Sequence, residues 1–156
     1  MSETLRMPTD DELVVNEKIF GRCNHNFWTE FQDRDGRQML GCSDCGDEIM
    51  YRDSEDFGFG SEVPPAATPR EAWLRGIRHY STDPLMAALV VRVVEAGGWR
   101  PFVFERAGDV NCSFERGGKK FSSGQHPTKA AAVVEAAAML GRSGRFTVPV
   151  SFFSGL

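Results

Sequence analysis

The sequence contains no apolar run long enough to cross a membrane. The longest, from Leu85 to Val91, is about a third of the roughly 20 residues that a transmembrane helix needs. The N-terminus, MSETLRMPTDDE, is acidic where a secretory signal peptide would be basic. We therefore expect a cytoplasmic protein, in which thiols stay reduced and clustered cysteines indicate a metal site more than a disulfide framework.

The sequence also lacks a recognisable arrangement of catalytic residues. It has three histidines and four cysteines, no glycine-rich loop that would cradle a phosphate, and no nucleophile with an evident neighbouring base. An enzyme would have to use His79, Asp83, His126 or Glu135. Asp83 and His126 are explained as helix caps beside proline, and Glu135 as a solvated helix position. Catalysis is therefore the least supported class of function.

Neither half of the chain has balanced charge. Up to Glu62 there are 15 acidic and 6 basic residues, whereas from Val63 onward there are 7 acidic and 12 basic residues. An ordinary solvated surface explains this asymmetry, and a basic C-terminal half that faces an anionic partner is the alternative. The acidic loop from Asp53 to Glu62 belongs to a stretch rich in glycine and proline, which is typical of a linker.

The sequence predicts an α+β fold. Its part before Ser81 predicts two short helices. Thr9 followed by Glu12 forms a capping box before an amphipathic segment. The segment TPREAWLRGI predicts a further short helix, with Thr68 as its cap and Glu71 completing a second box. Both helices lie outside the C-terminal part of the chain, whose pattern is clearer.

From Ser81 onward the pattern predicts an α-β-β-β-α layered unit with an antiparallel sheet. Asp83 caps a helix that stops at Gly97, and three β-favouring segments separated by short turns follow it. A last helix has Pro127 at its start and Gly141 at its end. The three expected strands are Trp99–Glu105, Val110–Glu115 and Lys119–Ser122.

Two further expectations concern the sheet of this unit. The stretch RFTVPVSFF alternates apolar and polar residues and predicts an additional edge strand, because Pro149 argues against a central position. In the middle strand, Val110, Cys112 and Phe114 share one face, which we expect to be buried. Cys112 should therefore behave as a small hydrophobic residue and not as a ligand or nucleophile.

Three of the four cysteines and one histidine lie within CNHNFWTEFQDRDGRQMLGCSDCG. Its CSDCG segment has the C-x2-C form of a metal knuckle, in which backbone N–H groups point at the sulfurs and the following glycine permits a left-handed turn. The other half is a C-x-H pair, which is a weaker signal. The residues between them resemble a hairpin with its turn at Asp35-Gly36, which would bring the halves together. The sequence therefore predicts a tetrahedral zinc site formed by Cys23, His25, Cys42 and Cys45.

The predicted ligand set also indicates the role of the metal. Three thiolates and one imidazole fill all four positions of a tetrahedral ion, whereas catalytic zinc keeps one position for water or substrate. We therefore expect a structural zinc and a function of binding. The predicted domains are 1–52, an N-terminal helix and zinc-ribbon-like module; 53–80, an acidic and proline-rich linker with a short helix; and 81–156, the α-β-β-β-α domain with the possible extra edge strand.

Several short motifs between Asp11 and Leu140 carry a family resemblance: ELVVNEKIFG, the C-x-H pair with CSDCG, HYSTDP, GGW, and HPTKAAAVVEAAAML. Together they resemble the phage ABA sandwich domain family. The resemblance implies a phage or prophage origin, an α/β layered fold and no assigned reaction. On this basis we expect a zinc-binding accessory protein that binds a host or phage macromolecule in the bacterial cytoplasm, and that interferes with bacterial defence or regulation.

A nucleic-acid-binding function is the alternative. The α-β-β-β-α order is also that of a double-stranded RNA-binding domain, in which lysines at the start of the last helix contact phosphates across the major groove. The contacts here would be Lys119, Lys120 and Lys129. Only Lys129 lies in that helix, which is fewer than such a module typically has.

Overall fold

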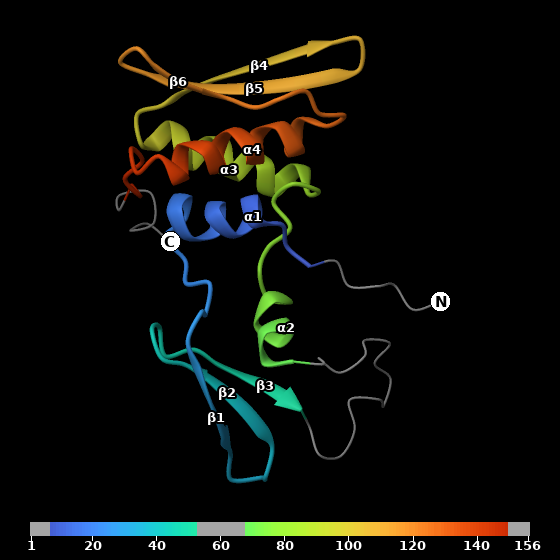
Figure 1. Ribbon diagram of the computed structural model, residues 1–156, viewed down its shortest axis with the longest axis vertical. Coiled ribbons are helices and arrows are strands. Elements are labelled where there is room, and N and C mark those ends of the chain that lie inside the picture. The colour runs from blue at the N-terminus through green and yellow to red at the C-terminus, as the bar shows by residue number, and fades with distance from the viewer. Residues whose placement is uncertain (1–6, 53–67, 150–156) are drawn as a thin grey trace. The chain divides into compact units, whose positions relative to one another are not determined.

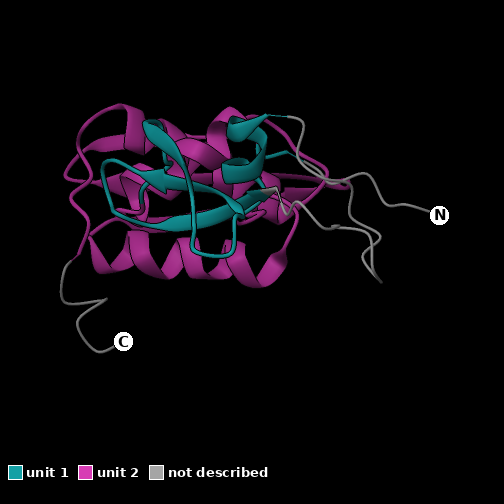
Figure 2. Ribbon diagram, turned by 90° about the horizontal axis from the view of Figure 1, so that it is seen from below, with its two compact units in different colours: residues 1–8, 23–77 teal, residues 9–22, 78–156 magenta. Residues whose placement is uncertain are grey.

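The structure is a computed structural model of the whole chain, in which residues 7–52 and 68–149 are described (Figure 1). Helices and two antiparallel three-stranded sheets make up these residues, which confirms the predicted α+β class. None of the helices in the two described ranges is both long and apolar enough to span a bilayer. The chain forms two compact units, coloured separately in Figure 2. Unit 1 is residues 1–8 and 23–77, and unit 2 is residues 9–22 and 78–156.

Unit 1 contains a sheet with the strand order β1-β2-β3. Its strands are β1 (Trp28–Gln32), β2 (Gln38–Cys42) and β3 (Glu48–Arg52). In the turn between β1 and β2, Asp33 Oδ1 accepts hydrogen bonds from the backbone N–H groups of Asp35 and Arg37, both at 2.9 Å, and Gly36 has a φ of +79°. The predicted hairpin is therefore present, and β3 is an additional strand that the sequence interpretation missed.

A short helix, α2 (Pro69–Leu74), completes unit 1. It begins as predicted, because the Thr68 hydroxyl accepts a hydrogen bond from the Glu71 backbone N–H at 3.1 Å. The Trp73 side chain, which is 3% exposed, packs with Leu40 and Cys42 in a small buried cluster, as far as the structure describes this unit. So small a core contributes little stabilisation by itself.

Unit 2 contains the predicted α-β-β-β-α order. Its sheet is formed by β4 (Arg100–Arg106), β5 (Asp109–Arg116) and β6 (Lys119–Ser122), with β5 in the centre. Helices α3 (Pro84–Ala96) and α4 (Lys129–Arg142) lie on one face of this sheet (Figure 1). Val110, Cys112 and Phe114 of β5 point to that face and are buried in the core of the unit, as predicted.

The predicted start of α3 agrees with the structure, whereas the predicted ends of α4 do not. Asp83 caps α3 as expected, since its carboxylate accepts a hydrogen bond from the Leu85 N–H at 3.0 Å. The prediction for α4 was wrong at both ends. Its N-cap is Thr128, whose hydroxyl accepts from the Ala131 N–H at 3.2 Å, so that Pro127 lies outside the helix. Gly141 lies within the last turn and is buried.

The predicted N-terminal helix is α1 (Asp10–Val14), which continues as one π-helical turn, η1 (Val15–Ile19). Its capping box is confirmed: the Thr9 N–H donates to Glu12 at 2.9 Å, and the Glu12 N–H donates to the Thr9 hydroxyl at 3.2 Å. The Glu12 carboxylate is fully buried and also accepts from the Ser81 N–H at 3.1 Å.

This N-terminal helix belongs to unit 2, whereas the sequence interpretation grouped it with the cysteine module. Its close neighbour is α4, at the position of Gly141. A Cβ atom added to Gly141 would lie 2.9 Å from Lys18 Cβ and 3.1 Å from Val14 Cγ1. The two helices therefore touch where α4 has no side chain, a complementarity that chain order does not indicate.

Two predictions fall wholly or partly outside the described residues. Residues 145–149 contain no strand, and the rest of the expected edge strand, from 150 onward, is not described. The acidic loop from Asp53 to Glu62 also lies outside the described residues.

Candidate metal centre

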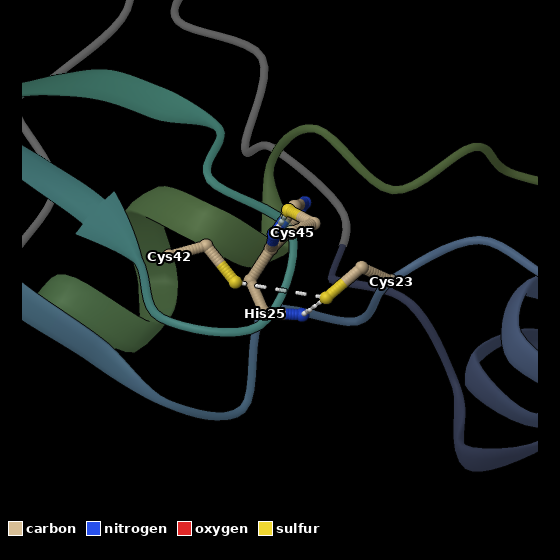
Figure 3. A group of neighbouring side chains, drawn as sticks. All are labelled: Cys23, His25, Cys42 and Cys45. Atoms are coloured by element: carbon tan, nitrogen blue, oxygen red, sulfur yellow. Dashed lines mark hydrogen bonds between the residues drawn. The ribbon is translucent and has the colours of Figure 1, made fainter.

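The predicted ligands come from three short segments of unit 1 (Figure 3). Cys23 and His25 precede β1, Cys42 is the last residue of β2, and Cys45 lies in the turn between β2 and β3. The register of the hairpin brings these segments together, because Trp28 at the start of β1 pairs with Cys42 at the end of β2. The hairpin thus brings the C-x-H pair and the C-x2-C pair together, as predicted from the sequence.

The four side chains form one cluster. Their ligand atoms all lie within 4.8 Å of one another. Cys23 Sγ is 3.6 Å from Cys42 Sγ, and Cys45 Sγ is 3.4 Å from His25 Nδ1. Cys42 is buried, Cys23 and His25 are half-buried, and Cys45 is exposed. The cluster is therefore close enough to bind a metal ion at the surface of the unit.

The turn after β2 has the geometry of the predicted knuckle. The Gly46 N–H donates to the Cys42 carbonyl at 3.0 Å, and the Cys42 N–H donates to the Asp47 carbonyl at 2.8 Å. Gly46 has a φ of +80°, which is why a glycine suits this position. Backbone N–H groups of Asp44 and Cys45 donate to the Cys42 sulfur, an arrangement that stabilises a thiolate.

The cysteines differ in how readily they ionise. Burial alone would raise the pKa of Cys42, but hydrogen bonds from the Cys45 and Asp44 backbone and from His25 lower it to about 6. Burial raises the pKa of Cys23, and burial together with the neighbouring thiols raises that of Cys45 to about 12. Without a cation, then, Cys42 is the thiol of the cluster that ionises most readily. A bound cation would offset the burial and the interactions with neighbouring thiols that raise the pKa of Cys23 and Cys45.

Helix α2 holds the C-x-H segment in place. His25 has a φ of +54°, an uncommon conformation for a residue other than glycine, and its N–H donates to Cys23 Sγ at 3.3 Å. The Arg70 guanidinium donates to the Asn24 carbonyl at 2.7 Å and to the His25 carbonyl at 3.0 Å. The imidazole of His25 stacks on the indole of Trp73, with ring centroids 4.3 Å apart. The sequence analysis did not place Arg70 or Trp73 in the site. The available signal was Trp73, a single tryptophan in a short helix.

The fourth cysteine is separate from this cluster. Cys112 is fully buried in the core of unit 2, and burial raises the pKa of its thiol to about 11. It therefore packs as a small apolar side chain, as predicted.

The residues considered for catalysis make local contacts within unit 2. The prediction that His126 is a helix cap was wrong: its backbone pairs with Val110, and its Nε2 lies 3.3 Å from Glu135 Oε2. The prediction that Glu135 is simply solvated was also wrong. Its carboxylate accepts a hydrogen bond from the Gly124 N–H, which together with His126 lowers the pKa of Glu135. The pair fastens the segment before α4 to that helix. His79 supplies a carbonyl oxygen to the turn before α3.

The three lysines predicted to contact duplex RNA do not form one patch. Lys129 is the first residue of α4 and lines a cavity of about 570 Å³ beside the N-terminal end of α3. Lys119 lines another cavity with Arg145, which lies just beyond the C-terminal end of α4. A 14-residue helix rises roughly 20 Å, so these two lysines lie at opposite ends of it. Lys120 lies 3.8 Å from Glu115.

Comparisons with known proteins add nothing to this geometry. No protein-family model, curated protein or solved structure matches the chain. The resemblance to the phage ABA sandwich domain family stays a prediction from its motifs.

Proposed function

We propose that this protein is a non-catalytic binding protein in which one structural zinc ion stabilises unit 1. The observation that carries the proposal is the convergence of four ligand atoms, three sulfurs and one imidazole nitrogen, within 4.8 Å of one another. Thiolate and imidazole donors together suit zinc, whereas magnesium and calcium prefer oxygen ligands.

The distances between donor atoms support a tetrahedral site. Two sulfurs at about 2.3 Å from one zinc ion and at a tetrahedral angle lie about 3.8 Å apart, and a sulfur and an imidazole nitrogen lie about 3.6 Å apart. The corresponding distances here are 3.6 Å between Cys23 and Cys42 and 3.4 Å between Cys45 and His25 Nδ1. These two distances are close to those of tetrahedral zinc, and the other donor pairs lie within 4.8 Å.

The donor set and the surroundings favour a structural role for the ion. Four protein ligands leave no coordination position for a substrate or a reactive water. Among the described residues, the buried hydrophobic cluster of unit 1 consists of Leu40, Cys42 and Trp73, and one of these is a ligand. A unit with so little buried apolar surface gains much of its stability from metal binding.

The proposed partner is a macromolecule of the bacterial cytoplasm, in line with the motifs shared with a phage family. The protein would act as a phage accessory protein towards a host or phage component, for example one of bacterial defence or regulation. The support for this part is the resemblance of ELVVNEKIFG, CSDCG and HPTKAAAVVEAAAML, and it is independent of the metal geometry.

Cobalt substitution tests the closed structural site. The purified protein should contain one zinc per chain by elemental analysis. Its cobalt-substituted form should absorb strongly as a tetrahedral thiolate complex, and azide should leave this spectrum unchanged because no position is open. Less than half an equivalent of zinc in metal-replete preparations would disprove the zinc site, and a spectrum that azide shifts would disprove its closed, non-catalytic character.

A further inference from the structure

The hairpin turn between β5 and β6 places two cations directly opposite each other. Arg116, the last residue of β5, pairs with Lys119, the first residue of β6, across Gly117 and Gly118. Both glycines have a positive φ, +54° and +83°, as a two-residue turn of type I′ requires. Like charges that face each other across two strands destabilise a sheet. A counter-charge beside this pair would therefore be favourable.

The neighbouring pair of the same hairpin has such a counter-charge. Glu115 pairs with Lys120, and their side chains lie 3.8 Å apart as an ion pair. Arg116 and Lys119 form no ion pair in the part of the chain that the structure describes. Successive residues of a strand point to opposite faces, so Arg116 shares the helix-covered face with the buried Phe114. Glu115 and Lys120 belong to the other face.

On the helix-covered face, the two cations line a cavity of about 340 Å³. The remaining lining residues are Trp99, Gly117 and Arg145, so the cavity has a third cation and no acidic side chain. The Trp99 ring packs against Phe121, with 5.6 Å between the ring centroids, and Phe121 is two residues from Lys119 on this face. Sites for small molecules typically have volumes of about 300–1,000 Å³.

Several hydrogen-bond donors of this cavity lack an acceptor. Arg116 donates to the Gly97 carbonyl at 3.3 Å, which holds its guanidinium at the end of α3 and leaves other N–H groups available. Trp99 is 3% exposed, and its buried indole N–H has no partner among the described residues. Because buried donors are normally paired, this N–H indicates a ligand that carries an acceptor.

The ends of the two long helices offset only part of the positive charge. Trp99 and Arg145 lie three residues beyond the last residues of α3 and α4, so the C-terminal ends of both helices are close to the cavity. Each such end carries about half a negative charge, and the two together balance about one of the three cations. A charge of about +2 remains, which matches the charge of about −1.5 to −2 on a phosphate monoester at pH 7.

We propose that this cavity of unit 2 binds the phosphate group of a small molecule, with the Trp99 indole N–H as one of its donors. The donors come from three segments of the chain, an arrangement that suits tetrahedral phosphate oxygens better than a flat carboxylate. Arginine binds phosphate through paired hydrogen bonds, and lysine adds a point charge. The inference goes beyond the proposed function and uses none of the metal ligands.

NMR of the indole N–H groups in the full-length, zinc-loaded protein tests this inference. The chain has three tryptophans, and Trp28 and Trp73 belong to unit 1, so their signals are internal controls. ADP should shift the Trp99 signal downfield in a saturable manner, because its N–H then donates to a phosphate oxygen. Adenosine, which lacks the phosphates, should leave the signal in place. Inorganic phosphate is the third probe, and its affinity relative to ADP distinguishes the free ion from a phosphate ester as the ligand.

Two lysines of β6 provide a matched pair of variants. Lys119→Gln removes a cation that lines the cavity and should weaken ADP binding about tenfold, the effect of losing one hydrogen bond to a charged group. Lys120→Gln makes the same change of charge one residue away, on the opposite face, and should weaken binding less than twofold. Arg145→Gln should resemble Lys119→Gln, because Arg145 also lines the cavity.

Several results would overturn the inference. They are a Trp99 signal that no phosphate probe shifts, equal responses to adenosine and ADP, and equal losses for Lys119→Gln and Lys120→Gln. A short single-stranded oligonucleotide that binds more tightly than ADP would also overturn it, because the ligand would then be a polymer. Zinc content, measured on the same samples, tests the structural zinc independently. A protein with one zinc and an unresponsive Trp99 signal would refute only this inference.

Discussion

The imidazole of His25 stacks on the indole of Trp73, with 4.3 Å between the ring centroids. This contact joins a predicted metal ligand to a helix that lies more than forty residues further along the chain. Arg70, from the same helix, adds hydrogen bonds to the carbonyls of Asn24 and His25. Because His25 holds a left-handed backbone conformation, these contacts are what fix its ring beside the three sulfurs.

Arg70→Ala should therefore weaken metal binding without removing a ligand. Residues that orient metal ligands typically contribute 10- to 100-fold to affinity, and we expect about tenfold here because Arg70 contacts backbone and not the imidazole itself. Competition with a chromophoric zinc chelator measures the change. Arg34→Ala, an exposed arginine in the turn of the same unit, is the control and should leave affinity unchanged. Equal affinities for both variants would show that α2 does not position His25.

Replacing a ligand should unfold one unit and spare the other. Cys42→Ser leaves a poorer ligand, so the protein should lose its zinc, and unit 1 has too small a core to stay ordered without it. Limited proteolysis should then cut within 23–52 and leave a resistant fragment that spans α3 to α4. Chelator should have the same effect on the unchanged protein.

The matched control for that experiment is Cys112→Ala, which removes the thiol buried in unit 2. It should keep a full equivalent of zinc and a protected unit 1. A Cys42→Ser variant that loses zinc but keeps 23–52 protected would contradict the structural role of the metal. One that becomes sensitive throughout would contradict the independence of the two units.

Sequence patterns predicted those features that depend on neighbours along the chain. The cap at Asp83 and the spacing of Cys42 and Cys45 both act within one turn, so their geometry is readable from the sequence. Gly141 is the opposite case. A glycine that ends a helix and one that admits a neighbouring helix look alike in sequence, and here Gly144, with a φ of +75°, is the glycine that follows the helix end. The role of Gly141 depends on α1 and η1, which lie more than a hundred residues away in the sequence.

The candidate metal site likewise has a part that the sequence predicted and a part that it did not. The ligands follow from residue type and spacing, whereas Arg70 and Trp73 became part of the site only through the folding of unit 1. Strand β3 was missed because its sequence, EIMYR, is short and follows the knuckle directly, with no turn signal beyond Gly46. Polar residues such as Glu135 looked solvated because their partners, Gly124 and His126, lie on another element.

Glu135 should make the stability of unit 2 depend on pH. Its pKa is lowered from the ordinary value of 4.5 in the folded protein, so its contribution is fully present above that value and is lost as the pH falls through the lower, folded pKa. Glu135→Gln should reduce the free energy of unfolding by about 0.5–1 kcal/mol at pH 7, a modest figure because the carboxylate is partly exposed. The difference from the unchanged protein should shrink below pH 4.5.

Urea unfolding between pH 7 and about pH 3 measures this difference. Glu95→Gln, an exposed position of α3, is the control and should have no such pH dependence. If the effect of Glu135→Gln stayed constant across the range, the carboxylate charge would have no part in fastening the segment before α4.

Gly141→Ala tests the close packing of α1 and η1 on α4. In an open helix position this change would stabilise the protein by up to about 1 kcal/mol, because alanine favours helix over glycine. Here the new methyl group would lie 2.9 Å from Lys18 Cβ, which is bonded directly to the backbone of the neighbouring helix, and 3.1 Å from Val14 Cγ1. Overpacking of this kind typically costs about 1–3 kcal/mol, so we expect net destabilisation of unit 2.

The matched control for Gly141→Ala is Gly124→Ala, whose added Cβ would meet Glu135 Oε1 at 3.5 Å, an ordinary contact. Thermal or urea unfolding should show a clear loss for Gly141→Ala and little change for Gly124→Ala, while zinc content stays the same in both. The sign of the first effect is decisive. A more stable Gly141→Ala protein would mean that the helix-propensity gain dominates, which is possible only if the N-terminal helix does not lie against α4 at this point.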